Sequence, residues 1–309
     1  MQLQFSTACL TRAPLQTSFA AARSLGMGSI ELALTPTLFR RGVSRIARLA
    51  EQQRLAVGSL DLSPLGDAAF DSTLVRSLAA FARALPGCAV VALPTPGARR
   101  ATTGGLNGLN SYLSLLGAYG EALGDRATLT LINPPGGLAA APGPLDRFPH
   151  LRRIVEEWDL GYTFDTSHAA SAGWVITEPL PSMGTRLRNI HLNDFRQHPG
   201  LDQHHPTSFI PASVGAWQLG RAPGEGVLPL RAFLRVLRRR EYDGLVTVAL
   251  REVGVRAWWP PSLSSRLIAA SGFCRGALEG YHPRQALPDY PPFGPPGASA
   301  ETENEGRRA

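Results

Sequence analysis

Short apolar runs recur along the chain and alternate with longer segments in which the apolar residues follow helical spacing. The apolar runs predict eight β-strands, over residues 3–7, 29–34, 55–60, 88–93, 128–132, 161–165, 188–192 and 245–250. The segments between them predict helices over residues 15–25, 38–54, 72–85, 109–123 and 145–158. They also predict a helix at the start of residues 169–183, one that begins at Pro229 and a closing helix within residues 261–279. The fourth run is wholly apolar, which is typical of a parallel strand covered on both faces.

Regular alternation of strands and helices indicates an α/β protein with a parallel sheet. Eight such units predict a closed (β/α)8 TIM barrel, which commonly needs about 250 residues. A doubly wound open sheet is the alternative, but it would require a glycine-rich phosphate loop after the first strand, and residues 7–14 contain no glycine. We therefore expect one barrel domain over residues 1–281. Residues 282–309 are dominated by proline, glycine and small or charged residues, and we expect a disordered tail there.

All 31 basic residues are arginines. The absence of lysine from the sequence excludes Schiff-base catalysis and a phosphate-loop lysine. The net charge of +7 would suit an anionic partner, but the arginines are scattered, so we do not expect nucleic-acid binding. The three cysteines are far apart and odd in number, which argues against a disulfide framework. With no signal peptide and no apolar stretch of membrane-spanning length, we expect a cytoplasmic protein without membrane contact.

Five of the seven histidines lie between residues 168 and 205, interleaved with carboxylates. Asp165 and His168 belong to a D-T-S-H motif that ends the sixth predicted strand, and His191 begins an H-L-N-D motif at the end of the seventh. Asp202 and His204 follow in a D-Q-H-H run. Imidazole and carboxylate are the usual ligands of zinc and manganese, and barrel active sites lie at the carboxyl ends of the strands. The pattern therefore predicts a metal or substrate site at that end.

Each of these residues also has a simpler interpretation. Asp165 could cap the helix that follows its strand. His191 could be a hydrogen-bonded histidine of the barrel core, and Asp202 and His204 could belong to a solvated loop.

The F-D-T-S-H-A-A-S-A-G segment at residues 164–173 closely resembles the sixth-strand motif of the xylose-isomerase-like barrel superfamily, which joins sugar isomerases and epimerases to endonuclease IV. The H-L-N-D motif is similar to the seventh-strand motif of that group. The P-G-E-G run at residues 223–226, with Y-D-G at residues 242–244, resembles its approach to the eighth strand. The resemblance is specific from about residue 163 to residue 250. It implies a TIM barrel that acts on a small carbohydrate or sugar phosphate.

In the epimerase branch, the resemblance implies a metal ion held by a glutamate on strand five, an aspartate on strand six, a histidine on strand seven and a glutamate on strand eight. The two glutamates also move a proton. The aspartate and the histidine correspond to Asp165 and His191. The strand-five position falls on Ile132, or on Asn133 if the register shifts by one, and the strand-eight position falls on Ala249. The divalent metal of this branch is therefore either held by an altered ligand set or lost.

In the endonuclease IV branch, the resemblance implies a zinc ion held by residues that correspond to His168, Asp202 and His204, all of them retained. The other two zinc ions of that branch need histidines after strands three and four, and this sequence has none in either place. A three-metal phosphodiesterase is therefore disfavoured.

Three hypotheses remain open. The first is a divergent metal-dependent sugar isomerase or epimerase; the second is an endonuclease IV-like zinc phosphodiesterase; the third is a non-catalytic barrel with a degenerate metal site. The candidate catalytic residues are Asp165, His168, His191 and Glu225, and the candidate ligands of zinc or manganese are Asp165, His168, His191, Asp202 and His204. We interpret Glu31 as structural and Asp194 as a partner that fixes a histidine tautomer.

Overall fold

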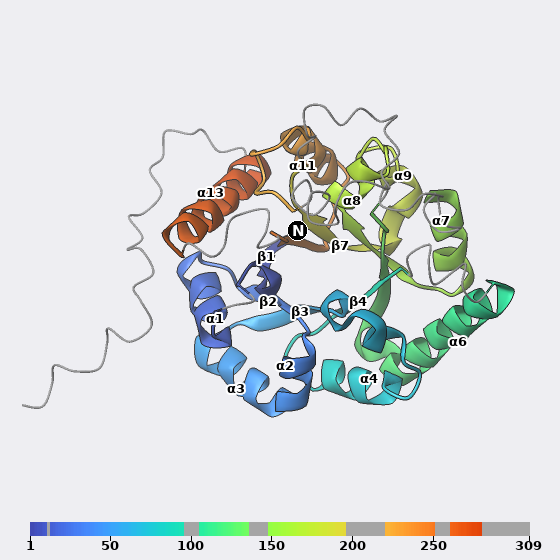
Figure 1. Cartoon of the computed structure of the whole chain (residues 1–309). Helices are drawn as coiled ribbons and strands as arrows, with labels where there is room; N and C mark the ends of the chain where they lie inside the picture. Colours follow the sequence, from blue (N-terminus) through green and yellow to red (C-terminus); the bar gives the residue numbers. More distant parts are fainter. Residues whose placement is uncertain (11–12, 96–104, 136–147, 196–219, 251–259, 280–309) are drawn as a thin grey trace, which may run out of the picture.

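The structure, a computed structural model, describes residues 1–10, 13–95, 105–135, 148–195, 220–250 and 260–279 (Figure 1). Its eight strands are β1 (Gln2–Ser6), β2 (Ser29–Ala33), β3 (Ala56–Asp61), β4 (Val90–Pro94), β5 (Thr128–Ile132), β6 (Gly161–Asp165), β7 (Leu187–Leu192) and β8 (Leu245–Val248). Each strand pairs in parallel with the next one in the sequence, and β8 pairs with β1, so the barrel is closed. The predicted TIM barrel is confirmed. Asp202, His204 and the expected tail lie outside the described residues.

The helices form a ring around the strands (Figure 1). They are α1 (Leu15–Ser24), α2 (Pro36–Arg41), α3 (Val43–Gln53), α4 (Val75–Arg83), α6 (Gly105–Leu123), α7 (Phe148–Glu157), α8 (Thr166–Ser171), α9 (Leu180–Met183), α11 (Leu230–Arg239) and α13 (Pro260–Glu279). Four 3-10 helices join them: η1 (Thr7–Leu10), η2 (Ser63–Phe70), η3 (Gly124–Arg126) and η4 (Gly184–Arg186). Within the described ranges, no helix has both the length and the apolar character needed to cross a membrane. The three cysteines are buried free thiols.

One expected helix is broken by glycine. The helix expected over residues 38–54 is two helices, α2 and α3, because the backbone at Gly42 has φ 77°. Side chains rarely tolerate this left-handed conformation, so the chain turns at that position. Residues 169–183 are helical at their start, as predicted, because α8 continues to Ser171 and the chain then turns at Gly173, where φ is 76°.

The two faces of the barrel strands have opposite character. Outward positions are apolar and pack against the helices, among them Phe5, Ile30, Leu60, Phe164, Ile190 and Val246. Inward positions carry polar side chains that hydrogen-bond to one another across the barrel, among them Gln4, Glu31, Ser59, Thr130, Thr163, Asn189, His191 and Thr247. A buried polar group is costly unless it is hydrogen-bonded, so this interior is stable only because its members bond to each other.

Candidate active site at the carboxyl ends of the strands

The carboxylate of Glu31 is the centre of the interior network. Its Oε2 atom accepts hydrogen bonds from Ser59 Oγ at 2.8 Å, Asn189 Nδ2 at 3.1 Å and His191 Nε2 at 2.9 Å. Burial alone would raise the pKa of Glu31, but the charge and hydrogen bond of His191 lower it below its ordinary value. Glu31 is therefore an anion that is fully enclosed in protein.

Two of the donors to Glu31, Ser59 and Asn189, accept hydrogen bonds from other polar side chains of the barrel interior. The Nε2 atom of Gln4 donates to Ser59 Oγ at 2.7 Å and to Thr247 Oγ1 at 2.8 Å. Thr247 Oγ1 in turn donates to Asn189 Oδ1 at 2.8 Å. Gln4 and Thr247 thus hold Ser59 and Asn189, which donate to the Glu31 carboxylate and favour its charged form.

His191 lies between two carboxylates. Its Nε2–H donates to Glu31, and its Nδ1 atom lies 3.9 Å from Oδ2 of Asp165. Burial would lower the pKa of His191, but the negative charges of Glu31, Asp61 and Asp165 together with the hydrogen bond from Nε2 raise it to about 9. In this arrangement the ring is an imidazolium at neutral pH.

Asp165 is the N-cap of α8, as its simpler interpretation required. Its Oδ1 atom accepts the backbone N–H of His168 at 2.9 Å and the hydroxyl of Ser167 at 3.0 Å. Its Oδ2 atom accepts from Asn193 Nδ2 at 3.2 Å and lies 3.7 Å from His168 Nε2. The capping role and a role in the site are compatible, because different oxygens serve them.

The tautomer of His168 is fixed by a main-chain carbonyl. Since a carbonyl oxygen can only accept, His168 Nδ1–H donates to Asn133 O at 2.9 Å. The Nε2 atom is then the one that faces Asp165. The Asn133 side chain also clamps the end of β6, accepting from Asp165 N at 2.7 Å and donating to Asp165 O at 3.1 Å.

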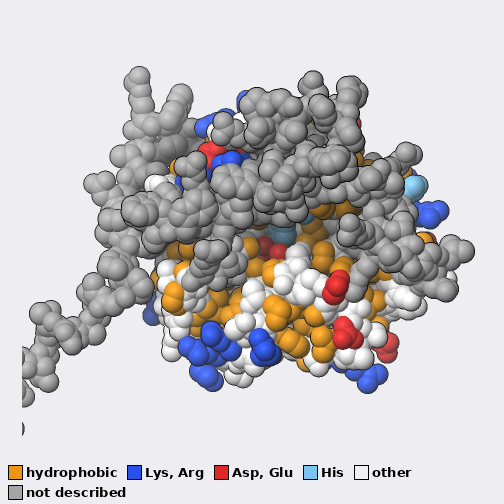
Figure 2. All heavy atoms as spheres, in the orientation of Figure 1, with side chains coloured by type: hydrophobic (Ala, Val, Ile, Leu, Met, Phe, Trp, Pro, Cys, Tyr) orange, Lys and Arg blue, Asp and Glu red, His pale blue; other side chains and the backbone are white. Residues whose placement is uncertain are grey.

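Asp61 is the last residue of β3, and among the described residues its hydrogen bonds come from Ser63, whose backbone N lies 2.9 Å from Oδ1. The side chain is 8% exposed. Burial and the negative charge of Glu31 raise the pKa of Asp61 above its ordinary range. With Glu31, Asp165, His168 and His191, it completes a cluster of five buried ionisable side chains. In Figure 2, acidic and histidine side chains are visible at the bottom of a central hollow.

The contacts of Asp194 are with backbone N–H groups and not, as predicted, with a histidine of the described residues. Its carboxylate accepts the backbone N–H groups of Phe195, Gly224, Gly226 and Leu228, at 2.8 to 3.0 Å. It therefore shapes the turn that leads to α11, and none of its hydrogen bonds with described residues goes to a histidine.

Glu225 lies on the turn that Asp194 shapes. Its side chain is 36% exposed, and Oε2 pairs with Arg266 of α13 at 3.2 Å. The structure therefore brings Asp165, His168 and His191 together and ties Glu225 to the helix layer.

The two positions at which the resemblance implies metal-binding glutamates, on strands five and eight, carry side chains that cannot bind a metal ion. Ile132 is buried at the end of β5, and Ala249 follows β8. Ligand atoms around a tetrahedral zinc ion are about 3.4 Å apart, since each bond is about 2.0–2.1 Å. The separations of 3.7 and 3.9 Å around Asp165 Oδ2 are wider. Within the described residues, no three His, Cys, Asp or Glu side chains form a group that could hold a metal ion.

The network partners were not found as site residues from the sequence. Glu31 was interpreted as structural, and Asp61 and Asn189 were given no role. A signal was present in the strands, where polar residues recur at every second position, as in Ser59 and Asp61 or in Asn189 and His191. That period marks one face of a strand.

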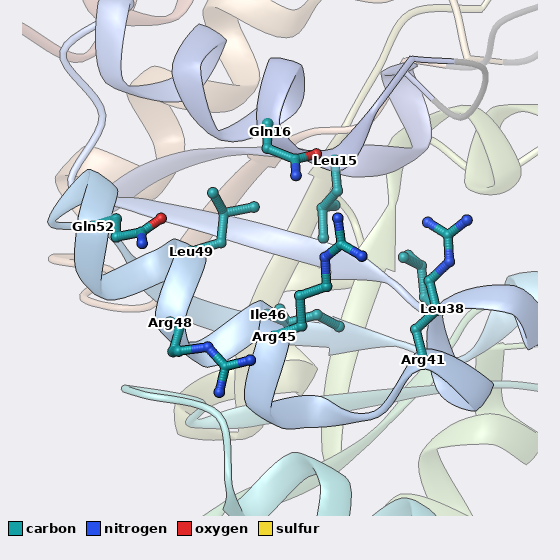
Figure 3. Close-up of a pocket in the computed structure, with 9 residues that line it drawn as sticks. All are labelled: Leu15, Gln16, Leu38, Arg41, Arg45, Ile46, Arg48, Leu49 and Gln52. Atoms are coloured by element: carbon teal, nitrogen blue, oxygen red, sulfur yellow. The ribbon is translucent and has the colours of Figure 1, made fainter.

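A second hollow, of about 180 Å³, lies outside the barrel between α1, α2 and α3 (Figure 3). Arg41, Arg45 and Arg48 project around it above an apolar base that includes Ile46 and Leu49. None of its lining residues belongs to the buried ionisable cluster.

Comparison with known proteins agrees with this architecture. Residues 19–265 match the family model described as xylose isomerase-like TIM barrel. A xylose isomerase domain protein from Alicyclobacillus acidocaldarius has a TM-score of 0.68 and 17% identity, with 90% of this chain and 98% of that chain covered.

Two further solved structures are similar in fold. The IolI protein with a bound zinc atom has a TM-score of 0.67 and 14% identity, with 92% and 100% of the two chains covered. D-psicose 3-epimerase with D-tagatose from Clostridium cellulolyticum H10 has a TM-score of 0.64 and 14% identity, with 90% and 99% covered. No curated protein sequence matches the chain. The family model covers most of the sequence, and the chain belongs to the xylose isomerase-like TIM barrel family.

Proposed function

We propose that this protein is a sugar isomerase or epimerase-like enzyme that acts on a small carbohydrate or sugar phosphate. The observation that carries the proposal is the cluster of Glu31, Asp61, Asp165, His168 and His191, buried together where barrel enzymes have their active sites. Buried ionisable groups cost stability, and strongly shifted pKa values are typical of functional sites. A purely structural barrel would have little use for five such groups at one end.

The structural neighbours support a sugar substrate. Their titles name epimerases of D-psicose, L-ribulose and D-allulose, two of them with a sugar bound. A sugar would find donors and acceptors in the cluster, because hydroxyl groups both donate and accept hydrogen bonds.

We further propose that a divalent ion, zinc or manganese, binds between Asp165, His168 and His191, with Asp202 and His204 completing the ligand set. The donor chemistry fits this ion. In each histidine, one ring nitrogen is hydrogen-bonded to an acceptor: Nδ1 of His168 and Nε2 of His191. The other nitrogen of each ring faces Asp165 Oδ2 and could bind the metal. The described donors are too few by themselves. A bound divalent ion would polarise the sugar carbonyl.

The chain's own residues would act on the substrate as follows. The rings of His191 and His168 orient the carbonyl and hydroxyl oxygens. Asp165, held by α8 and Asn193, keeps both rings in place. A group that removes a proton from carbon must have a lone pair that is free to accept it.

The test is proton exchange at carbon. D-tagatose, D-allulose and D-xylose are incubated in D₂O with the full chain and added Mn²⁺ or Zn²⁺, and ¹H NMR follows loss of the C–H signals and formation of new sugars. We expect exchange with at least one sugar, and a loss of about 100-fold or more in a His191→Ala variant. If the variant matched wild type, or if wild type neither bound nor altered these sugars or their phosphates, the proposal would be wrong.

A further inference from the structure

Asp61 occupies an inward position at the mouth of the barrel. It lies two residues after Ser59, whose hydroxyl reaches Glu31 inside the barrel, so both side chains are on the same face of β3. Its register neighbours on β2 and β4 are Ala33 and Ala92. Because both neighbours are small, the Asp61 carboxyl has no bulky side chain beside it in the sheet.

The three carboxyl groups of the cluster differ in how they are bonded. Glu31 receives three hydrogen bonds on one oxygen, and Asp165 receives bonds on both oxygens. Within the part of the chain that the structure describes, the hydrogen bonds to Asp61 come from Ser63. Glu31 is a weak base because its ion pair with His191 lowers its pKa, although its Oε1 has no donor among the described residues. Asp165 accepts hydrogen bonds on both oxygens, so Glu31 and Asp165 are suited to orienting other groups and Asp61 to exchanging a proton.

The charged groups around Asp61 also favour a role in exchanging a proton. Glu31 on β2 repels a second negative charge, while His191 on β7 attracts it, and the β4 neighbour Ala92 has no charge. Burial and Glu31 outweigh His191, so the pKa of Asp61 is raised. A carboxyl group with a raised pKa is closer to the ideal for a general base near neutral pH.

We propose that Asp61 is the residue that takes a proton from the carbon beside the sugar carbonyl and returns it. The inference rests on the proposed function and names a group that could replace the two glutamates absent at Ile132 and Ala249. It assigns a catalytic role to a residue that the sequence motifs did not single out.

The proposed step balances within the substrate. The ionised Asp61 removes the proton, the C–H bond breaks, and its electron pair forms a carbon–carbon double bond as the carbonyl oxygen becomes an enediolate oxygen. The hydroxyl proton of the neighbouring carbon moves to that oxygen, and Asp61 returns its proton to the former carbonyl carbon. One carboxyl group serves one face of the sugar, so the reaction class is aldose–ketose isomerisation.

The experiment compares Asp61→Asn with wild type in the full chain, with D-tagatose, D-allulose and D-xylose as probes. Asparagine keeps an oxygen for the Ser63 N–H but cannot hold the proton. Carbon–hydrogen exchange in D₂O is measured by ¹H NMR, and sugar binding is measured separately by calorimetry. Asp125→Asn is the matched control, since Asp125 is exposed in η3, just before the amino end of β5.

We expect exchange and isomerisation to fall about 100-fold or more in Asp61→Asn, with binding within about threefold of wild type and no change in Asp125→Asn. If wild type exchanges and Asp61→Asn exchanges equally well, Asp61 is not the base, and the proposed function stands. If wild type binds and exchanges no sugar, the proposed function is wrong and the inference falls with it. Epimerisation without isomerisation would overturn the reaction class.

Asp61→Glu provides a second variant in case Asp61→Asn fails to fold. It keeps the carboxyl group and moves it by one methylene. Exchange reduced by about tenfold or more, with binding kept, is expected for a misplaced base. Exchange at the wild-type rate would overturn the assignment.

Discussion

His191 donates a hydrogen bond from Nε2 to Oε2 of Glu31 at 2.9 Å, and both side chains are buried inside the barrel. A residue of the seventh strand is thereby joined to one of the second strand, 160 positions apart in sequence. The pair connects the candidate site at the strand ends with the hydrogen-bond network inside the barrel.

Removal of the charge on Glu31 should destabilise the protein strongly. In Glu31→Gln, the His191 imidazolium would lose its buried partner, which typically costs about 3–5 kcal/mol. Urea unfolding followed by circular dichroism measures the free energy of unfolding. Ser59→Ala is the control, because it removes one neutral donor and should cost about 1 kcal/mol. Equal effects of the two substitutions would contradict an ionised Glu31.

The ion pair should also make stability depend on pH. The pKa of His191 is raised from 6.5 to about 9 in the folded protein. Since a raised pKa means that the folded state holds the proton more tightly, the stabilisation is fully present below about pH 6.5 and is lost as the pH rises through about 9. The loss should amount to about 3 kcal/mol at most.

This pH dependence can be measured in protein stripped of metal with a chelator, by urea unfolding at several values between about pH 6 and about pH 10. His191→Gln is the comparison, since it removes the titrating group and should flatten this part of the curve. A wild-type curve that already matches the variant would mean that His191 is not protonated in the fold.

A surviving metal site can be tested directly by inductively coupled plasma mass spectrometry on protein purified without a histidine tag. We expect near-stoichiometric zinc or manganese in wild type and little in a variant with both His168→Ala and Asp202→Ala, because both are proposed ligands. His150→Ala controls for the loss of a histidine elsewhere, in α7. Metal-free wild type that gains no thermal stability from added metal would remove the metal from the proposal.

Asp194 should govern the turn before α11. Asp194→Ala removes the acceptor of four backbone N–H groups, and we expect a loss of about 2–4 kcal/mol. Hydrogen exchange should speed up at the amides of Gly224, Gly226 and Leu228 while the amides of β7 stay protected. Gly226→Ala should act similarly, because a Cβ there would collide with the Phe195 carbonyl and the Asp194 carboxylate.

The fold, and the proximity of Asp165 and His191 in the candidate site, could be predicted from the sequence for a physical reason. Strands and helices in this chain carry their own apolar periodicity, and Asp165 and His191 lie at strand ends, where the barrel brings them together. These signals are local, so one sequence suffices to find them.

The rest of the site depends on contacts between distant strands. Glu31 becomes part of it only through His191, and Asn133 only through His168 and Asp165. The break at Gly42 was missed because the flanking residues alone fit one continuous helix. Hydrogen bonds across the barrel are set by register, and register is fixed by closure of the whole sheet.

The separation of apolar outer faces from a polar interior has a consequence for evolution. Outward residues such as Phe5, Ile30 and Phe164 supply the hydrophobic contacts with the helices, so the frame does not depend on which groups stand at the inner rim. An apolar Ile132 or a small Ala249 can therefore replace a reactive side chain while the barrel still closes. Such a scaffold can change its reaction one strand end at a time, without refolding.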